Sequence, residues 1–234
     1  MKIPLSNRLL TCCGYVRPGD RVADIGCDHG YLGIHLLQEG IASFVIAADV
    51  KEQPLHSAYS NARKYGVSEN MAFYLSDGVK NIPRTFDTLV CAGMGADTMI
   101  SILSAAPWLK ASCYRLILQC QSKRPLLQSY LSREGYAIRR ETLAQDGKFL
   151  YPVMEVVYEP GQILTGAHTY ISPALLESGS PLLPAFLDRV IVGVENTLLG
   201  LSRTGGSAYE EQQTLLEQLK RMRARLTNTQ GGSL

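Results

Sequence analysis

Short apolar runs alternate, over residues 1–160, with longer stretches in which apolar side chains recur every three or four positions. The short runs are almost uninterrupted, which is typical of strands that are covered on both faces of a sheet. The longer stretches have the period of amphipathic helices. The pattern predicts strands at 21–26, 43–49, 71–75, 88–92 and 115–119, and helices at 3–16, 31–39, 53–65, 96–103 and 123–134.

Two further strand-like runs, 137–143 and 151–158, follow with only a short connection between them, residues 144–149. So short a connection predicts an antiparallel hairpin, because parallel neighbours need a crossover of a dozen or more residues. The alternation of strands and helices before it predicts a parallel sheet with helices on both faces. The sequence therefore predicts an α/β domain with a seven-stranded sheet that ends in an antiparallel hairpin.

The composition changes to Gly, Pro, Ser and Thr between residues 160 and 184, and two helical stretches follow. Such a change indicates a linker or a cap. Leucine and valine recur at three- and four-residue spacing in the helical stretches, which indicates an antiparallel, coiled-coil-like helical hairpin. We expect a cofactor-binding domain at 1–160, a linker or cap at 161–181 and the helical hairpin at 182–228.

One turn concentrates glycines and carboxylates. The sequence reads DIGCDHGYL from Asp24 to Leu32, between the first strand and its helix. The glycines match neither the dinucleotide pattern GxGxxG nor the phosphate loop GxxxxGK[ST]. The pattern Asp24-x-Gly26-x-x-x-Gly30 is the usual first motif of S-adenosylmethionine-dependent methyltransferases, whose cofactor carries an ammonium and a sulfonium and no phosphate. The alternative is a βα turn in another α/β protein. The motif favours a Rossmann-like class I methyltransferase fold.

The ends of the next three strands carry further candidates. Asp49 ends the second strand, where it can accept hydrogen bonds from both ribose hydroxyls of an adenosine, or it caps the next helix. Asp77 follows the third strand, where it can contact an adenine amino group or form an ordinary Asp-Gly turn. The fourth strand ends in Gly93-Met94-Gly95 rather than the [Asn/Asp]-Pro-Pro-aromatic turn that holds exocyclic amines. This difference argues against an exocyclic amino group as the methyl acceptor.

Composition narrows the class of protein. With 23 basic and 21 acidic residues the net charge is +2, so no overall excess of positive charge indicates a nucleic-acid partner. The six cysteines have no spacing that suggests zinc. No apolar run approaches the length of a membrane span, and we find no signal core. We expect a cytoplasmic protein, reduced, with no metal and no membrane partner, as a monomer or weak dimer.

A local cluster of cations stands in the last helical stretch. Its members are Lys220, Arg221, Arg223 and Arg225. They are candidate tRNA contacts, or they are favourable charges near a helix C-terminus on a solvated face.

The chain resembles the bacterial tRNA adenine-N1-methyltransferase family that modifies adenine 22 of tRNA. The matching segments are Leu5-Ser6-x-Arg8-Leu9, the loop from Asp24 to Leu32, Asp77-Gly78, Ala92-Gly93-Met94-Gly95, Tyr151-Pro152 and the C-terminal helical hairpin. Gly33 and Ala96 depart from the family's usual proline and glycine. The resemblance implies S-adenosylmethionine as cofactor, tRNA as substrate and methylation of N1. That atom lies on the Watson–Crick edge, so the base must leave its stack.

Motifs and resemblance together give the predicted site. The cofactor-binding residues are Asp24, Gly26, Cys27, Asp28, Gly30, Tyr31, Leu32, Asp49, Val50, Asp77, Gly78, Gly93 and Met94. The catalytic candidates are Asp28, His29 and Arg8. Asp28 stands where generic methyltransferases usually have glycine, so its carboxylate either faces the target base or fixes the loop by accepting backbone N–H bonds. Two other functions stay open: a methyltransferase for a small molecule or protein, and a non-enzymatic cofactor-binding interaction module.

Overall fold

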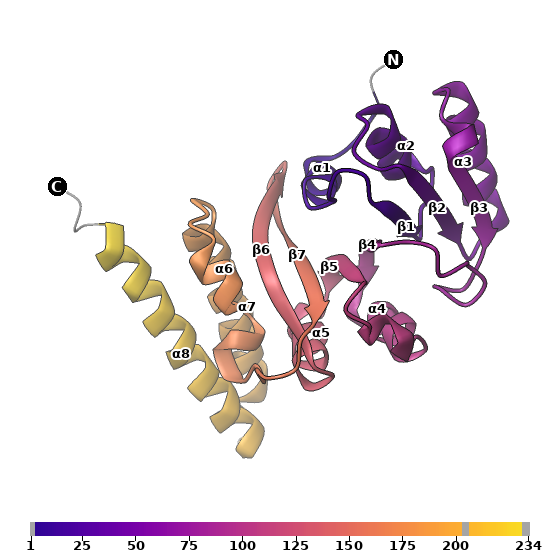
Figure 1. Cartoon of the computed structure of the whole chain (residues 1–234). Coiled ribbons are helices and arrows are strands. Elements are labelled where there is room, and N and C mark those ends of the chain that lie inside the picture. Colours follow the sequence, from indigo (N-terminus) through magenta and orange to yellow (C-terminus); the bar gives the residue numbers. More distant parts are fainter. Residues whose placement is uncertain (1–2, 203–205, 231–234) are drawn as a thin grey trace. The chain divides into compact units, whose positions relative to one another are not determined.

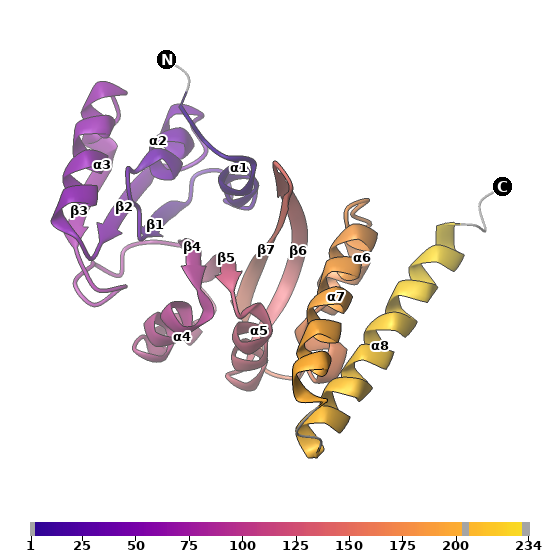
Figure 2. The same ribbon diagram turned by 180° about the vertical axis from the view of Figure 1, so that it is seen from behind.

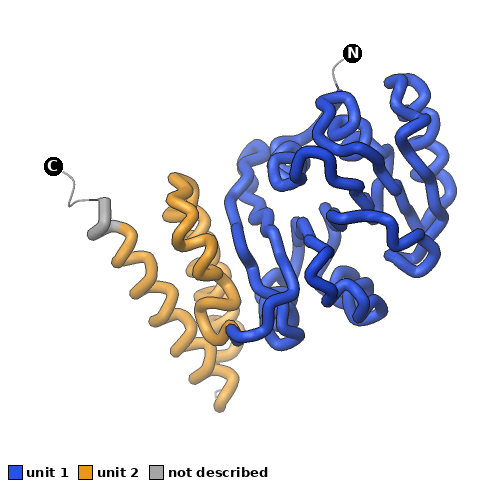
Figure 3. Tube along the Cα trace, viewed as in Figure 1, with its two compact units in different colours: residues 1–163 blue, residues 164–234 orange. Residues whose placement is uncertain are grey.

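The computed structural model (Figure 1) describes residues 3–202 and 206–230, and the chain forms two compact units. The first unit is Met1–Ile163 and the second is Leu164–Leu234 (Figure 3). No helix among the described residues is both long enough and apolar enough to cross a membrane.

The first unit is built on one mixed sheet. Its strands are β1 (Arg21–Ile25), β2 (Phe44–Asp49), β3 (Met71–Leu75), β4 (Thr88–Gly95), β5 (Arg115–Ser122), β6 (Tyr136–Asp146) and β7 (Phe149–Tyr158). The order is β3-β2-β1-β4-β5-β7-β6, with β1 to β5 parallel and β7 antiparallel to both β5 and β6. The predicted seven-stranded sheet with a terminal antiparallel hairpin is confirmed.

Four strands extend beyond their predicted bounds. β4 runs on through Gly93-Met94-Gly95, because these residues continue to pair with β5 through an irregular register. β5 extends correspondingly to Ser122. The hairpin strands reach Asp146 and Phe149, so only Gly147 and Lys148 remain in the turn. The sequence did not predict these extensions, because the residues with which the strand ends pair are distant or unknown until the sheet has formed.

Helices cover both faces of the sheet (Figures 1 and 2). The helices of this unit are α1 (Asn7–Cys13), α2 (Tyr31–Gln38), α3 (Glu52–Lys64), α4 (Ala96–Ser104) and α5 (Arg124–Arg133), with short 3-10 turns η1 (Ser68–Asn70) and η2 (Pro107–Lys110). Side chains of α4 and α5 share one apolar core with Ala23 and Leu89, whereas α1, α2 and α3 share the other with Val22 and Val45. Successive strand residues thus serve opposite cores, which explains the uninterrupted apolar runs.

The second unit is helical and contains η3 (Gly166–Thr169), α6 (Pro173–Glu177), α7 (Leu183–Leu201) and α8 (Ser207–Gln230). The two long helices form an antiparallel hairpin, because Lys220 pairs with Glu195 while Arg223 pairs with Asp188. Their apolar seam includes Leu187, Val194 and Leu219, all buried. The expected linker at 161–181 contains η3 and α6, which belong to this unit. The sequence has Gly205-Gly206 between the two helical stretches, and Gly205 lies outside the described residues.

Candidate functional site

A cavity of about 230 Å³ opens at the carboxyl ends of β1 and β4. These are the neighbouring central strands at which the strand order reverses, the usual place for a ligand in an open α/β sheet. The cavity is lined by Arg8, Leu9, Asp24, Gly26, Cys27, Asp28, His29, Tyr31, Leu32, Ala92, Gly93 and Gln121. Most of the predicted loop residues and all three catalytic candidates therefore meet in one cavity.

The loop after β1 needs glycine at two points. Gly26 and Gly30 have φ angles of +70° and +71°, in the left-handed region that favours glycine. A Cβ on Gly26 would collide with the end of the Met94 side chain, and one on Gly30 would lie 2.9 Å from the Ala58 Cβ. The loop is thus pressed between β4 and α3, and the glycines allow that approach.

Asp24 places a buried carboxyl group at the cavity. Its pKa is raised to about 7, chiefly by burial and also by nearby Asp49, while the hydrogen-bonding N–H of Gly33 lowers it. Within the described chain, its Oδ2 atom has no hydrogen-bond partner. A buried acceptor without a partner is costly, so a cationic ligand group in the cavity would fit here. Gly33 is also sterically required, because a Cβ there would lie 2.7 Å from Cγ1 of Val45.

Asp49 links two loops rather than lining the cavity. Its Oδ2 atom accepts the backbone N–H of Asp28 at 3.2 Å, and its Oδ1 atom accepts that of Lys51 at 3.0 Å. The side chain is 9% exposed, so part of the carboxylate remains reachable. The predicted ribose contact stays a prediction, now for a residue that also fixes the loop geometry.

Asp28 has an unusual backbone. Its φ angle is +50°, a conformation that aspartate tolerates better than most residues. The side chain is largely exposed, and its Oδ1 atom lies 3.7 Å from Nε2 of His29. Among the hydrogen bonds of the described residues, none runs from a backbone N–H to this carboxylate. The loop is held through the backbone N–H of Asp28, which leaves its carboxylate available at the cavity.

Arg8 is positioned from two sides. The backbone N–H groups of Asn7 and Arg8 donate to the carboxylate of Asp146 at 2.7 Å and 3.2 Å, which fixes the start of α1. The Nη1 atom of Arg8 donates to Oε1 of Gln119 at 3.0 Å, and the same oxygen accepts the N–H of Gly93 at 3.1 Å. The guanidinium is therefore held beside the end of β4. This tether also explains why α1 begins at Asn7 and not, as expected, at residue 3.

Gln119 and Gln121 are functional candidates that the sequence reading missed. Gln119 is fully buried, and its Nε2 atom has no hydrogen-bond partner within the described structure. Gln121 is exposed and lines the cavity. The available signal was a pair of glutamines two residues apart, directly after the apolar run 116–118, since a buried amide requires a hydrogen-bond partner.

Several predicted cofactor contacts do not line the cavity. Val50 is 62% exposed at the end of β2, and Asp77 pairs with Lys80 at 2.5 Å beyond the end of β3. Gly78 has a φ angle of +60°, and a Cβ there would lie 2.8 Å from Cγ1 of Ile102. Asp49, Gly30 and Met94 likewise lie outside the lining. The carboxyl ends of β1, β2 and β3 lie at the same edge of the sheet, so a ligand that extends beyond the cavity could reach these residues. Their contacts with the cofactor stay predictions.

The cations of α8 are largely engaged within the second unit. Lys220 pairs with Glu195 at 2.7 Å and Arg223 with Asp188 at 2.8 Å, both across the helical hairpin. Arg221 pairs with Glu217 at 3.4 Å on the same helix. Arg225, the fourth member, also makes an interaction. These pairs give the cations a role in the helical hairpin that neither alternative from the sequence included, and the predicted tRNA contacts stay a prediction.

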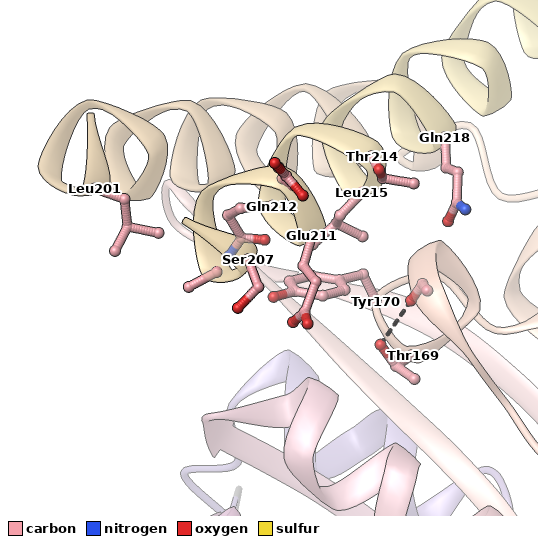
Figure 4. A pocket seen from close by; sticks show the side chains of 12 residues that line it. Thr169, Tyr170, Leu201, Ser207, Glu211, Gln212, Thr214, Leu215 and Gln218 are labelled. Carbon is pink, nitrogen blue, oxygen red and sulfur yellow. Dashed lines mark hydrogen bonds between the residues drawn. The ribbon is translucent and has the colours of Figure 1, made fainter. Parts of the chain in front are cut away.

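A larger hollow of about 760 Å³ lies in the second unit between η3 and α8 (Figure 4). Tyr170, Glu211 and Gln218 contribute to its wall. Glu210 and Glu211 make it acidic, so it does not suit a phosphate. The three catalytic candidates line the smaller cavity at the ends of β1 and β4. Within residues 3–202 and 206–230 no cluster of histidine, cysteine or carboxylate side chains is suited to a metal ion.

Comparisons with known proteins identify the family. Residues 5–154 match the family described as a methyltransferase domain. The chain belongs to this methyltransferase family. A tRNA (adenine(22)-N(1))-methyltransferase of Bacillus subtilis (strain 168) is 33% identical over 149 residues, which cover 63% of this chain and 63% of that protein. The matched stretch thus spans about three fifths of the length of this curated relative.

Two solved structures are similar to this chain over almost its whole length. The B. subtilis M1A22 tRNA methyltransferase is 25% identical, with a TM-score of 0.78 over 97% of this chain and 99% of that one. Sp1610 of Streptococcus pneumoniae, in complex with S-adenosyl-L-methionine, is 25% identical with a TM-score of 0.81, covering 94% and 99%. The resemblance that the sequence motifs indicate is confirmed, as is the class I methyltransferase fold.

Proposed function

We propose that this chain is an S-adenosylmethionine-dependent methyltransferase that methylates N1 of adenine 22 in tRNA. The observation that carries the proposal is the cavity, which is lined by Arg8, Asp28 and the buried carboxylate of Asp24, one oxygen of which has no hydrogen-bond partner among the described residues. This arrangement suits a cationic cofactor beside the buried carboxylate and a nucleobase beside Arg8 and Asp28. The named relatives supply the choice of tRNA and of the adenine.

The chain offers a group for each part of the cofactor. The bound cofactor supplies an electrophilic methyl group on a sulfonium. Asp24 would hold its ammonium group, because the carboxylate is buried, reachable from the cavity and short of one partner. Asp49 would accept hydrogen bonds from the ribose hydroxyls, and Val50 and Asp77 would lie beside the adenine of the cofactor. The likeness to Sp1610 in complex with S-adenosyl-L-methionine supports this choice of cofactor.

The acceptor atom suits the end of β4. N1 of adenine already has a lone pair, so the strand need not provide oxygens to hold an amine. Gly93 has no side chain to occupy this space, and a Cβ on it would lie 3.5 Å from the Nη1 atom of Arg8. Holding the base and the methyl group in line is itself a large part of the rate acceleration. Gln119 orients Arg8, and Arg8 in turn positions the base at the cavity.

Charge develops on the base as N1 is methylated, because the neutral ring becomes a cation. The carboxylate of Asp28 would stabilise that charge or accept a proton from the N6 amino group. His29 lies beside Asp28 and is a positioning candidate. The adenine must first leave its stack, since N1 lies on the pairing edge.

The deciding experiment uses labelled cofactor and unmodified tRNA, followed by nucleoside analysis. We expect label in 1-methyladenosine, and loss of the label in a matched transcript that carries guanine at position 22. A parallel incubation with ribosomal proteins tests a protein substrate, because relatives named ribosomal protein L11 methyltransferase also match part of the chain. Label in protein but not in tRNA would overturn the proposal. Cofactor binding without transfer to either would favour a non-enzymatic module.

A further inference from the structure

The β6–β7 hairpin ends in a two-residue turn with aromatic side chains beside it. Asp146 pairs with Phe149, and Ala144 pairs with Tyr151. Directly opposed residues of antiparallel strands project to the same face, as do residues two apart on one strand. Asp146, Phe149 and Tyr151 therefore share one face of the hairpin tip.

The aromatic side chains on this face are not fully covered. Phe149 is 53% exposed, and its ring centroid lies 6.2 Å from that of Tyr151. The Nζ atom of Lys148 lies 5.5 Å from the centroid of the Phe149 ring. We call Lys148, Phe149 and Tyr151 the tip platform. A single exposed apolar side chain is ordinary, and what distinguishes Phe149 is the second ring and the cation beside it, which together form a surface on which a flat ring can stack.

The tip platform is coupled to the cavity through α1. Asp146, on the same face as Phe149, accepts the backbone N–H groups of Asn7 and Arg8. Arg8 lines the cavity. The hairpin tip lies beside α1 in both ribbon views (Figures 1 and 2). A polymer that inserts one residue into the cavity would therefore have its neighbouring residues near the tip.

We propose that the tip platform stacks an unpaired base of the RNA substrate next to the adenine that enters the cavity. This proposal rests on the proposed function. Aromatic rings are common stacking surfaces for splayed bases in RNA, and every base offers a π face. Extracting the target adenine removes a stacking partner from its neighbour, and Phe149 replaces that partner. Lys148 adds a positive charge for the adjoining phosphate. An RNA partner is favoured over a protein because a cation accompanies the ring and the reactive cavity adjoins it.

The first test compares tRNA affinity across substitutions at Phe149. Phe149→Ala should weaken tRNA binding about 10-fold, within the range measured for one base stacked on an aromatic side chain. Phe149→Trp should restore the affinity, whereas Phe149→Leu, which keeps apolar bulk without a π face, should not. Cofactor affinity should stay unchanged throughout. Tyr59→Ala is the matched control, since Tyr59 is an exposed aromatic on α3 outside the cavity lining.

Fluorescence gives a second measurement that does not depend on the alanine variant. The wild type has one tryptophan, so Phe149→Trp adds a single new emitter. Saturating tRNA should quench that added emission, and it should not quench Tyr59→Trp. Unchanged tRNA affinity in Phe149→Ala, or no quenching in Phe149→Trp, would overturn the proposal while wild-type methylation of tRNA leaves the proposed function intact. A wild type that neither binds nor methylates tRNA would overturn both.

Discussion

The carboxylate of Asp49 accepts the backbone N–H of Asp28 across 3.2 Å and thereby joins the loop after β2 to the loop after β1. Its second oxygen accepts the N–H of Lys51. Asp28 has a left-handed backbone at this point, so the hydrogen bond helps to hold an otherwise unfavourable conformation. Asp49, which the sequence predicts to bind ribose, thus also holds the loop that carries the catalytic candidate Asp28.

Asp49→Ala should weaken binding of S-adenosylmethionine by about 1.5–3 kcal/mol, the range for hydrogen bonds to charged groups. Calorimetry on the purified protein measures this. Asp49→Asn is the matched variant, because it keeps one accepting oxygen and the side-chain size. Unchanged cofactor affinity in both variants would remove Asp49 from the ribose site and leave only its role in the loops.

Asp28→Asn should bind cofactor and tRNA normally, while its turnover falls by at least about 100-fold, the lower range for acid–base or electrostatic roles. Asp28→Gly is the control for backbone strain, since glycine adopts the left-handed conformation without a Cβ penalty. We expect the glycine variant to melt no lower than the wild type and yet to be inactive. Turnover that falls only in proportion to cofactor affinity would make Asp28 a loop residue.

Cofactor binding should depend on pH through Asp24. Burial raises the pKa of this carboxyl to about 7 in the free protein. A bound ammonium favours the ionised form, so binding near pH 6 should release a proton and affinity should fall as the pH drops below 7. Calorimetry in buffers of different ionisation enthalpy detects the proton. Asp24→Asn should abolish the release, and an identical release in that variant would contradict the assignment.

The same pKa shift predicts the pH dependence of folding. The folded-state pKa of Asp24 lies above its ordinary value of 3.8, so the folded protein holds this proton at pH values where the unfolded chain has lost it. The contribution of Asp24 to the free energy of unfolding is therefore greatest below pH 3.8 and declines as the pH rises towards 7. Urea unfolding of wild type and Asp24→Asn across this interval should show the free energy of unfolding of the wild type declining relative to that of the variant, and a constant difference would contradict the prediction.

The cations of α8 can be tested with a charge swap. Replacing Lys220, Arg221, Arg223 and Arg225 together by glutamine should weaken tRNA binding and flatten its salt dependence, if they contact phosphates. Arg223→Asp with Asp188→Arg keeps the ion pair but moves its positive charge to α7. We expect this pair to melt like the wild type and to bind tRNA less tightly. Wild-type tRNA affinity in the swap would assign Arg223 to hairpin stability alone.

Much of the architecture follows from local sequence. Buried strands such as β2 appear as apolar runs because both of their faces serve a core. The turn at Gly26 and Gly30 is visible because positive φ angles and close packing demand glycine there. Helix periodicity likewise predicts the helical hairpin at 182–228, in which the structure has α7 and α8.

The features of the site that the sequence did not predict depend on contacts between residues far apart in the chain. Gln119 orients Arg8 from 111 positions away, and Asp146 fixes the start of α1 from 138 and 139 positions away. Neither residue belongs to a motif, because its role exists only once the sheet is assembled. The place of Phe149 on a strand is equally invisible, because the sequence puts this residue in the connection at 144–149 and only pairing with Asp146 brings it into β7.

The cap that Asp146 places on α1 also constrains the order in which the chain becomes functional. The first helix emerges from the ribosome early, but its anchoring carboxylate is synthesised more than a hundred residues later. Contacts of such long sequence separation form late, because their loop-closure entropy is offset only after the intervening sheet has assembled. The loop at Gly26 is held by β2, α3 and Met94 of β4, all of which are synthesised well before Gln119 and Asp146. A nascent chain would therefore acquire the shape of its cofactor loop before Arg8 reaches its working position.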